Sequence, residues 1–240
     1  MAEKTTYHIR CPGCGHEQAV ELYESVNVRT DPVLRDQLMA NQLNVVQCEG
    51  CRISFRVDKP LLYHDPDRRF LLYLLPLAED QLPAGERHFA ETLRRVQAAL
   101  PGNSKPPAIG LILNRLELVE RIFLHEAGLN ERVVEYLKYM MYTRNPRRLD
   151  PDRKTILFNA QDSTDDTLCF VIQDVASRKL EGVLKYERKV YDALCEMFDR
   201  DEETPDLLEL FPGPYISARA LLRRESKEAA PRPAPKPPAP

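Results

Sequence analysis

The sequence predicts an α+β protein with a β-rich N-terminal domain, a second domain of helices and strands, and a disordered tail. Two Cys-x-x-Cys pairs stand near the N-terminus, each between short runs with the alternation typical of strands. Beyond residue 107, apolar residues recur at helical spacing and are followed by further strand-like runs. The last ten residues, PRPAPKPPAP, are too rich in proline to pack into a core.

The first cysteine pair lies between two expected strands, at residues 7–10 (YHIR) and within 17–28 (EQAVELYESVNV). A helix is expected next, with Asp31 as its N-cap and Pro32 as its first residue. This helix should end near Ala40. Its expected apolar face consists of Val33, Leu34, Leu38 and Met39.

The second cysteine pair lies between the expected strands 43–47 (LNVVQ) and 52–57 (RISFRV). A β-hairpin should follow, with strands at 60–63 and 70–75 around the turn Asp65-Pro66-Asp67. A helix is expected over 83–100, and the segment PGNSKPP then breaks the pattern. We therefore place the first domain at residues 1–104.

Cys11, Cys14, Cys48 and Cys51 have the spacing of a structural metal site. On a tight turn, Cys-x-x-Cys places two sulfur atoms on one side of the backbone, and zinc binds four thiolates at about 2.3 Å. Gly13, Gly15 and Gly50 suit such turns because glycine adopts left-handed backbone angles. The gap between the pairs exceeds the common ~15–20 residues, which the inserted helix explains. The sequence predicts a zinc ribbon with one structural Zn²⁺.

Other uses of four cysteines are less consistent with the sequence. Two disulfides need an oxidising compartment, whereas residues 1–10 contain no signal peptide. A thioredoxin-like site needs a βαβ unit around its Cys-x-x-Cys, and a catalytic zinc needs an open coordination position. An iron–sulfur cluster stays an alternative, because the cysteine spacing does not separate zinc from iron.

The motifs CPGCG, ESVNVRTDPVLRDQLMANQLNVVQCEGC and PLLYHDPDRRFLLYLLP together resemble the bacterial and archaeal CpXC domain family, over about residues 7–100. The resemblance implies a zinc-ribbon-like domain and no particular reaction. Because it includes the LLYHDP block, it makes Tyr63, His64 and Asp65 the candidate functional surface outside the cysteines. An ordinary surface or capping role is the other interpretation of His64 and Asp65.

The second domain is expected over residues 105–222 and should begin with a helical hairpin. Its first helix covers 108–127, followed by Gly128 at the position that favours glycine, and Asn130 should cap a helix that ends before Pro146. The expected inner faces are Ile109, Ile112, Leu116, Val119 and Phe123 in the first helix, and Val133, Val134, Leu137 and Met141 in the second.

Strands are expected at residues 154–159 (KTILFN) and 167–173 (TLCFVIQ). Residues 177–186 fit a third strand, while 183–198 fit a closing helix, so the sequence leaves this boundary open. The acidic stretch 199–209 should be a loop with one helical turn. The disordered tail is expected over 223–240.

The composition argues against several classes of partner. A net charge of −3 gives no general attraction to nucleic acid or anionic lipid, and residues 1–78 contain nine Lys and Arg against ten Asp and Glu. Arg144, Arg147, Arg148, Arg153 and Lys154 form a modest basic patch, but cations at a helix C-terminus also complement its dipole. No apolar run reaches the ~18–20 residues of a membrane span. Because the cysteines suit a reducing compartment and residues 1–10 contain no export signal, we expect a cytoplasmic protein.

The sequence favours a zinc-binding structural and interaction protein without catalytic residues. Its ribbon would present a surface that includes residues 63–69 to a protein partner. A nucleic-acid-binding zinc ribbon is one alternative. The other is an enzyme with a site between the two domains that uses His64 and Asp65.

Overall fold

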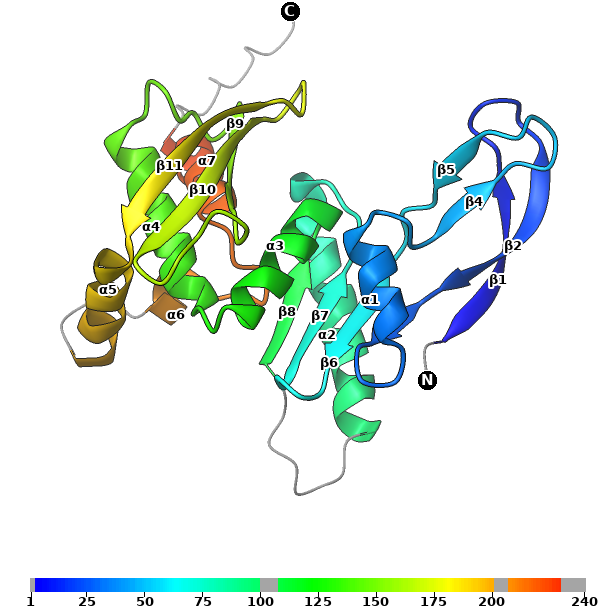
Figure 1. Cartoon of the computed structure of the whole chain (residues 1–240), viewed down its shortest axis with the longest axis horizontal. Coiled ribbons are helices and arrows are strands. Elements are labelled where there is room, and N and C mark those ends of the chain that lie inside the picture. Colours follow the sequence, from blue (N-terminus) through cyan, green and yellow to red (C-terminus); the bar gives the residue numbers. More distant parts are fainter. Residues whose placement is uncertain (1–2, 100–107, 201–206, 230–240) are drawn as a thin grey trace, which may run out of the picture. The chain divides into compact units, whose positions relative to one another are not determined.

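The computed structural model describes residues 3–99, 108–200 and 207–229. The chain forms two compact units (Figure 1), and each contains helices and strands, which confirms the α+β class. The first unit consists of Met1–Leu129 with Gly213–Tyr215, and the second of Asn130–Pro212 with Ile216–Pro240. The boundary expected after residue 104 lies outside the described residues, and the first unit continues beyond it to Leu129.

The first unit combines short β-ribbons, a sheet and three α-helices among its described residues. Its strands are β1 (Lys4–Arg10), β2 (Glu17–Tyr23), β3 (Ser25–Asn27), β4 (Val45–Gln47), β5 (Ser54–Arg56), β6 (Leu61–Asp65), β7 (Phe70–Leu74) and β8 (Ala108–Ile112). Its helices are α1 (Pro32–Met39), the short 3₁₀-helix Glu79–Gln81, α2 (Leu82–Ala99) and α3 (Arg115–Glu126).

A four-stranded mixed sheet in the order β3-β6-β7-β8 carries the core of the first unit. β6 and β7 are the expected antiparallel hairpin, while β3 and β8 pair in parallel with β6 and β7. One face is covered by α1 and α3, whose Leu38 and Ile122 share a buried cluster with Leu72 of the sheet. The inserted helix therefore packs on this sheet. Val33, expected on its apolar face, is 63% exposed.

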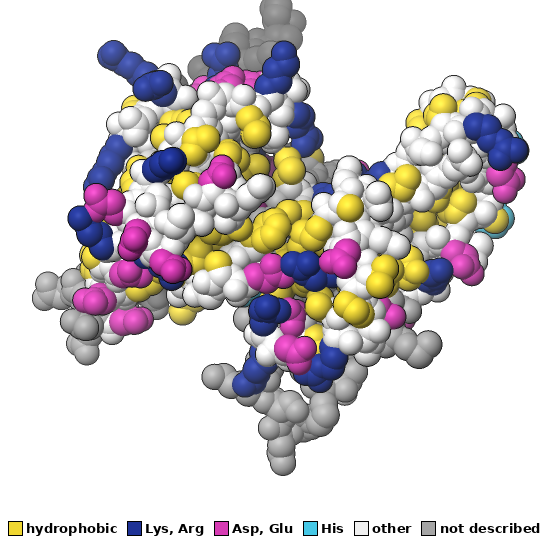
Figure 2. Space-filling model, in the orientation of Figure 1, with side chains coloured by type: hydrophobic (Ala, Val, Ile, Leu, Met, Phe, Trp, Pro, Cys, Tyr) yellow, Lys and Arg dark blue, Asp and Glu magenta, His cyan; other side chains and the backbone are white. Residues whose placement is uncertain are grey.

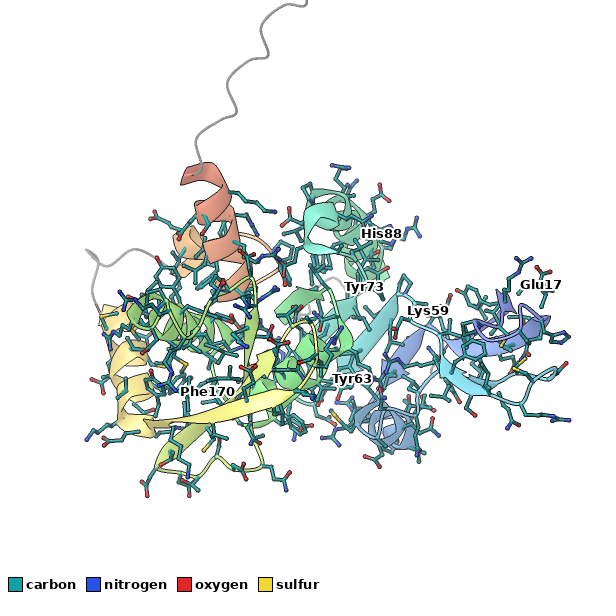
Figure 3. All side chains as sticks on the ribbon, turned by 90° about the horizontal axis from the view of Figure 1, so that it is seen from above. Glu17, Lys59, Tyr63, Tyr73, His88 and Phe170 are labelled. Atoms are coloured by element: carbon teal, nitrogen blue, oxygen red, sulfur yellow. The ribbon has the colours of Figure 1, made fainter. Side chains whose placement is uncertain are left out.

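The opposite face of the same sheet is covered by α2. The Tyr73 hydroxyl lies 2.9 Å from Nε2 of His88 on this helix, and the Tyr73 and Phe89 ring centroids are 6.4 Å apart. Figure 3 shows Tyr73 on the α2 side of the sheet and Tyr63 on the other side. The core of the first unit is thus this sheet between two layers of helices, and the β-ribbons are separate from it.

Residues 108–112 form strand β8, so the prediction of one helix over 108–127 is wrong for its first part. The strand pairs with β7 from Phe70↔Ala108 to Leu74↔Ile112. The apolar run AIGLI fits a buried strand as well as a helix, and only pairing with β7 decides between them. The buried face of the helix that follows, α3, also differs from the predicted one. Leu118 and Ile122 are fully buried, whereas Leu116, which was expected on the inner face, is 38% exposed.

Both helices of the predicted hairpin exist, with the expected signals at their ends. Gly128 follows α3 with φ of +65°. The Asn130 side chain accepts hydrogen bonds from the Arg132 and Val133 amides at 3.0 and 3.4 Å, which starts α4 (Glu131–Arg144). α3 belongs to the first unit and α4 to the second.

Residues 213–215 return to the first unit after most of the second has been formed. The Leu111 amide donates to the Pro214 carbonyl at 2.9 Å, so this segment lies beside β8. The Tyr215 hydroxyl donates to Glu117 Oε1 at 3.0 Å, and the Leu113 amide donates to Oε2 at 3.3 Å. Burial raises the pKa of Glu117 despite these donors.

The second unit packs helices around a three-stranded antiparallel sheet in the order β11-β10-β9. The Tyr142 hydroxyl of α4 donates to the Lys154 carbonyl at 3.1 Å, which ties this helix to the sheet. The amide of Ala218 donates to Glu135 Oε2 at 2.8 Å, and Lys138 pairs with Glu135 Oε1. Its other elements are β9 (Lys154–Phe158), β10 (Thr167–Asp174), β11 (Leu180–Glu187), α5 (Arg188–Arg200), α6 (Leu207–Leu210) and α7 (Ala218–Ala229).

The end of the chain differs from its predicted form. The segment that the sequence left open contains both a strand and a helix, because β11 ends at Glu187 and α5 begins at Arg188. α7 runs to Ala229, so the prediction of disorder from residue 223 is wrong for 223–229. The rest of the predicted tail lies outside the described residues. No helix in the described part is long and apolar enough to cross a membrane.

The packing of α1 predicts a contrast between two of its residues. Leu38→Ala should lower the free energy of unfolding by about 2–5 kcal/mol, because it opens a cavity in a fully buried cluster. Val33→Ala, at a surface position of the same helix, should change it by less than about 0.5 kcal/mol. Chemical denaturation of both variants measures the difference, and equal effects would contradict this packing.

Candidate metal centre

Each cysteine pair lies in the turn of an antiparallel β-ribbon. β1 and β2 pair from Lys4↔Tyr23 to Arg10↔Glu17, and residues 11–16 connect them. β4 and β5 pair from Val45↔Arg56 to Gln47↔Ser54, and residues 48–53 connect them. The sequence thus forms two ribbons whose turns each carry two cysteines.

The two turns have the same backbone geometry. In each, the amide of the first cysteine donates to the carbonyl five residues later, at 2.8 Å in the first turn and 2.9 Å in the second. The amide four residues after that cysteine donates back to its carbonyl, at 2.9 Å in both turns. This fourth residue is left-handed, with φ of +74° at Gly15 and +63° at Arg52.

Gly13 and Gly50 serve a different purpose from the one predicted. Neither has a positive φ. A Cβ atom at Gly13 would lie 2.5 Å from Ile53 Cδ1, and one at Gly50 would lie 3.2 Å from His16 Cβ. Ile53 and His16 occupy equivalent places in the opposite turns, so the two turns contact each other reciprocally. Both glycines permit this close approach.

The four sulfur atoms lie at distances suited to one metal ion. All are within 4.8 Å of one another, with Cys11 to Cys51 at 3.7 Å and Cys14 to Cys48 at 3.6 Å. A tetrahedron with metal–sulfur bonds of about 2.3 Å has sulfur–sulfur edges of about 3.8 Å. The two close pairs match this value, and all four cysteines are free thiols. Four sulfur donors in this arrangement suit zinc or iron.

Backbone amides favour negative charge on the buried sulfur atoms. Cys11 and Cys48 are buried, and their sulfur atoms accept from the Gly13 amide at 3.4 Å and the Cys51 amide at 3.5 Å. The backbone hydrogen bond from Cys51 lowers the pKa of Cys48 to about 6.

Not all four sulfur atoms are favoured as thiolates at once, because each lies close to the others. A backbone hydrogen bond with His16 lowers the pKa of Cys14, but hydrogen bonding with the Cys51 sulfur and burial outweigh it and raise this pKa to about 12. Like charges so close together disfavour one another unless a cation lies between them. A divalent cation would deprotonate all four thiols, since metal-bound cysteine is a thiolate. The residues therefore fit the predicted metal.

Gln18 and Asn44 support the site, and sequence reasoning missed both. The Gln18 side chain donates to the Gln47 carbonyl at 3.1 Å and accepts from the Glu49 amide at 2.9 Å, so β2 is bonded to the second turn. Asn44 exchanges two hydrogen bonds with the Tyr23 backbone, at 2.8 and 3.0 Å. Polar side chains of this kind have no periodic signal in a sequence, because their partners come from other strands.

The other candidate residues lie in the β6–β7 hairpin. Tyr63 is fully buried and stacks on Phe70, with ring centroids 5.8 Å apart. Asp65 is 1% exposed; its carboxylate accepts from the Asp67 and Arg68 amides at 3.1 Å and from the Arg68 guanidinium at 3.0 Å. Both residues support the hairpin and offer no side-chain surface to a partner.

His64 alone of these three is half-buried and partly accessible. Its carbonyl accepts from the Val28 amide at 3.0 Å in the pairing of β3 with β6. Burial lowers the pKa of its imidazole, although the nearby Asp65 opposes this shift. The imidazole is thus mainly neutral near pH 7.

The matched turns predict opposite effects at Gly15 and Arg52. Gly15→Ala should destabilise the first turn by about 1–2 kcal/mol, the cost of a left-handed residue with a Cβ atom. Arg52→Gly removes the same cost, but glycine loses more conformational freedom than arginine when the chain folds. The free energy of unfolding should therefore stay equal or rise by up to about 1 kcal/mol. Thermal unfolding of both variants tests this, and a destabilised Arg52→Gly would refute the equivalence of the turns.

Comparison with known protein families agrees with the cysteine framework. The model of the CpXC protein family matches residues 9–138, which is more than half of the chain. The match includes both cysteine turns and extends beyond the residues 7–100 on which the resemblance was based. Comparison with curated proteins and with solved structures gave no match. On its sequence and its four-cysteine site, the chain belongs to the CpXC family.

Proposed function

We propose that Cys11, Cys14, Cys48 and Cys51 hold one structural Zn²⁺ and that the resulting zinc ribbon binds a protein partner. The observation that supports zinc is the set of four free thiols within 4.8 Å of one another. Four thiolates fill a tetrahedral shell and leave no position for a substrate, which favours a structural role. Zinc is favoured over iron because zinc is the usual metal of paired Cys-x-x-Cys turns.

The stabilising role of the metal follows from how little the ribbons bury. β1 contains no buried residue, and β4 and β5 are three residues long and have none. Two-stranded ribbons of this kind are marginally stable by themselves. At such a site the free energy of metal binding is free energy of folding. The chain supplies thiolates, amide donors and close contact between turns, and the metal joins the ribbons.

The partner surface is proposed on the second ribbon and on the hairpin turn. Val45 and Ile53 are 43% and 41% exposed, so the second ribbon offers apolar side chains to a partner. Asp67, Arg68 and Arg69 of the hairpin turn are also exposed. Exposed apolar side chains and arginines are both common in protein–protein interfaces. This surface replaces Tyr63 and Asp65, which are buried.

Metal analysis tests the first part of the proposal. Untagged protein purified without added metal should contain about one zinc per chain by mass spectrometry, and Cys48→Ser should lose it. Cys195→Ser, which removes a cysteine outside the cluster, is the matched control and should keep the metal. Iron at the same stoichiometry, or no bound metal, would refute the zinc assignment.

Removal of the metal should have a local effect. Chelation should increase amide hydrogen exchange in β1, β2, β4 and β5, while α4 and β10 of the second unit stay protected. Unchanged exchange in the ribbons of metal-free protein would argue against a structural ion.

A pair of surface variants tests the partner surface. A protein that co-purifies with the wild-type chain should be lost from Val45→Asp and retained by Val183→Asp, which is 51% exposed on β11. Both variants should keep their zinc, because neither side chain belongs to the cysteine turns. Retention of the partner by Val45→Asp would place its binding site elsewhere.

A further inference from the structure

We propose that the second unit has a basic end that binds the phosphate backbone of nucleic acid without reading its sequence. The basic end consists of Arg144, Arg147, Arg148, Arg153, Arg178 and Lys179, all of which are exposed. This activity is separate from the zinc ribbon and does not rest on the function proposed for it.

Two hydrogen bonds bring these residues to one end of the unit. Tyr142, in the last turn of α4, is bonded to the Lys154 carbonyl at 3.1 Å. The Val175 amide donates to the Arg153 carbonyl at 2.9 Å, so the turn between β10 and β11 lies beside the segment that follows α4. Figure 2 shows Lys and Arg side chains along the edge of the second unit where Figure 1 places the end of α4 and this turn.

The acidic residues that lie close to this end in the sequence have other partners. Asp152 pairs with Arg223 at 2.7 Å. Asp174 and Glu181 both pair with Lys154, at 2.9 and 2.6 Å. The Asp150 carboxylate accepts from the Asp152 amide at 2.9 Å. Within the described residues, the six side chains of the basic end have no acidic partner, so their positive charge is available to an external anion.

The chemistry of the basic end fits phosphate diesters better than a protein surface. Five of its six cations are arginines, and the planar guanidinium donates two parallel hydrogen bonds to a phosphate. Protein interfaces usually have an apolar centre, but the large exposed apolar side chain here is Leu180 alone, at its margin. No Phe or Tyr of the described residues is exposed, so base stacking is not expected.

The net charge of the chain does not oppose this binding. The field of a local group of cations acts over about 8–10 Å at physiological salt, whereas the balancing acids elsewhere are screened. Neutralising several phosphates releases counterions, so the affinity should fall steeply as salt increases. Contacts with the backbone alone predict equal affinity for unrelated sequences.

Fluorescence anisotropy of the full chain with labelled single-stranded RNA of about 20 nucleotides tests the inference. We expect saturable binding at about 50 mM salt, with dissociation constants that agree within twofold among three unrelated sequences. Arg147→Glu/Arg148→Glu should weaken binding at least tenfold and reduce the slope of log K against log salt by about 1.4, or about 0.7 for each lost phosphate contact. Arg178→Glu should weaken it as well.

The control is Lys185→Glu, an exposed charge on β11 at the end of the strand away from the β10–β11 turn, and it should bind like the wild type. Absence of binding at low salt would overturn the proposal. So would equal losses in Lys185→Glu and in the double variant. Stronger binding of polyglutamate or of anionic phospholipid vesicles than of RNA would also overturn it, because the ligand would then be another polyanion.

Discussion

The meeting of four sulfur atoms is the constraint on which the N-terminal part of the protein depends. The two ribbons are separate two-stranded sheets, and they share no backbone ladder. What joins their turns is the cysteine cluster, the two hydrogen bonds of Gln18, and the contacts of Gly13 with Ile53 and of Gly50 with His16. Because the two turns are related by an approximate twofold axis, one ion between them would bind two cysteines of each turn in the same way.

The long gap between the cysteine pairs connects the cysteine cluster to the sheet. The segment between the turns contains β3 and α1, which pack in the core of the first unit. Where the ribbons leave this core, Lys59 pairs with Glu24 at 3.0 Å and lies 4.2 Å from the centre of the Tyr7 ring. The Tyr7 hydroxyl also bonds to Glu24, and these contacts lower the pKa of Glu24. The contacts among Tyr7, Glu24 and Lys59 therefore stabilise the junction between the ribbons and the core.

The sequence predicted what depends on local chemistry. The cluster of four cysteines, the capping of α4 by Asn130 and the glycine after α3 follow from residue types at fixed spacing. Prediction from the sequence was wrong where contacts with residues distant in the chain determine the structure. AIGLI is a strand because β7 is available to pair with it, and α1 buries Leu38 and exposes Val33 because the sheet lies on one side. The left-handed angle at Arg52 has no signal in its residue type.

The return of residues 213–215 to β8 makes the first unit discontinuous in the chain. The Pro214 carbonyl accepts from the Leu111 amide and the Tyr215 hydroxyl donates to Glu117, so both complete a structure begun about a hundred residues earlier. During synthesis from the N-terminus, the edge of β8 leaves the ribosome long before its neighbour exists. Both units are therefore discontinuous in the chain: residues 213–215 complete the first unit, and the segment from Ile216 onward, which contains α7, then completes the second.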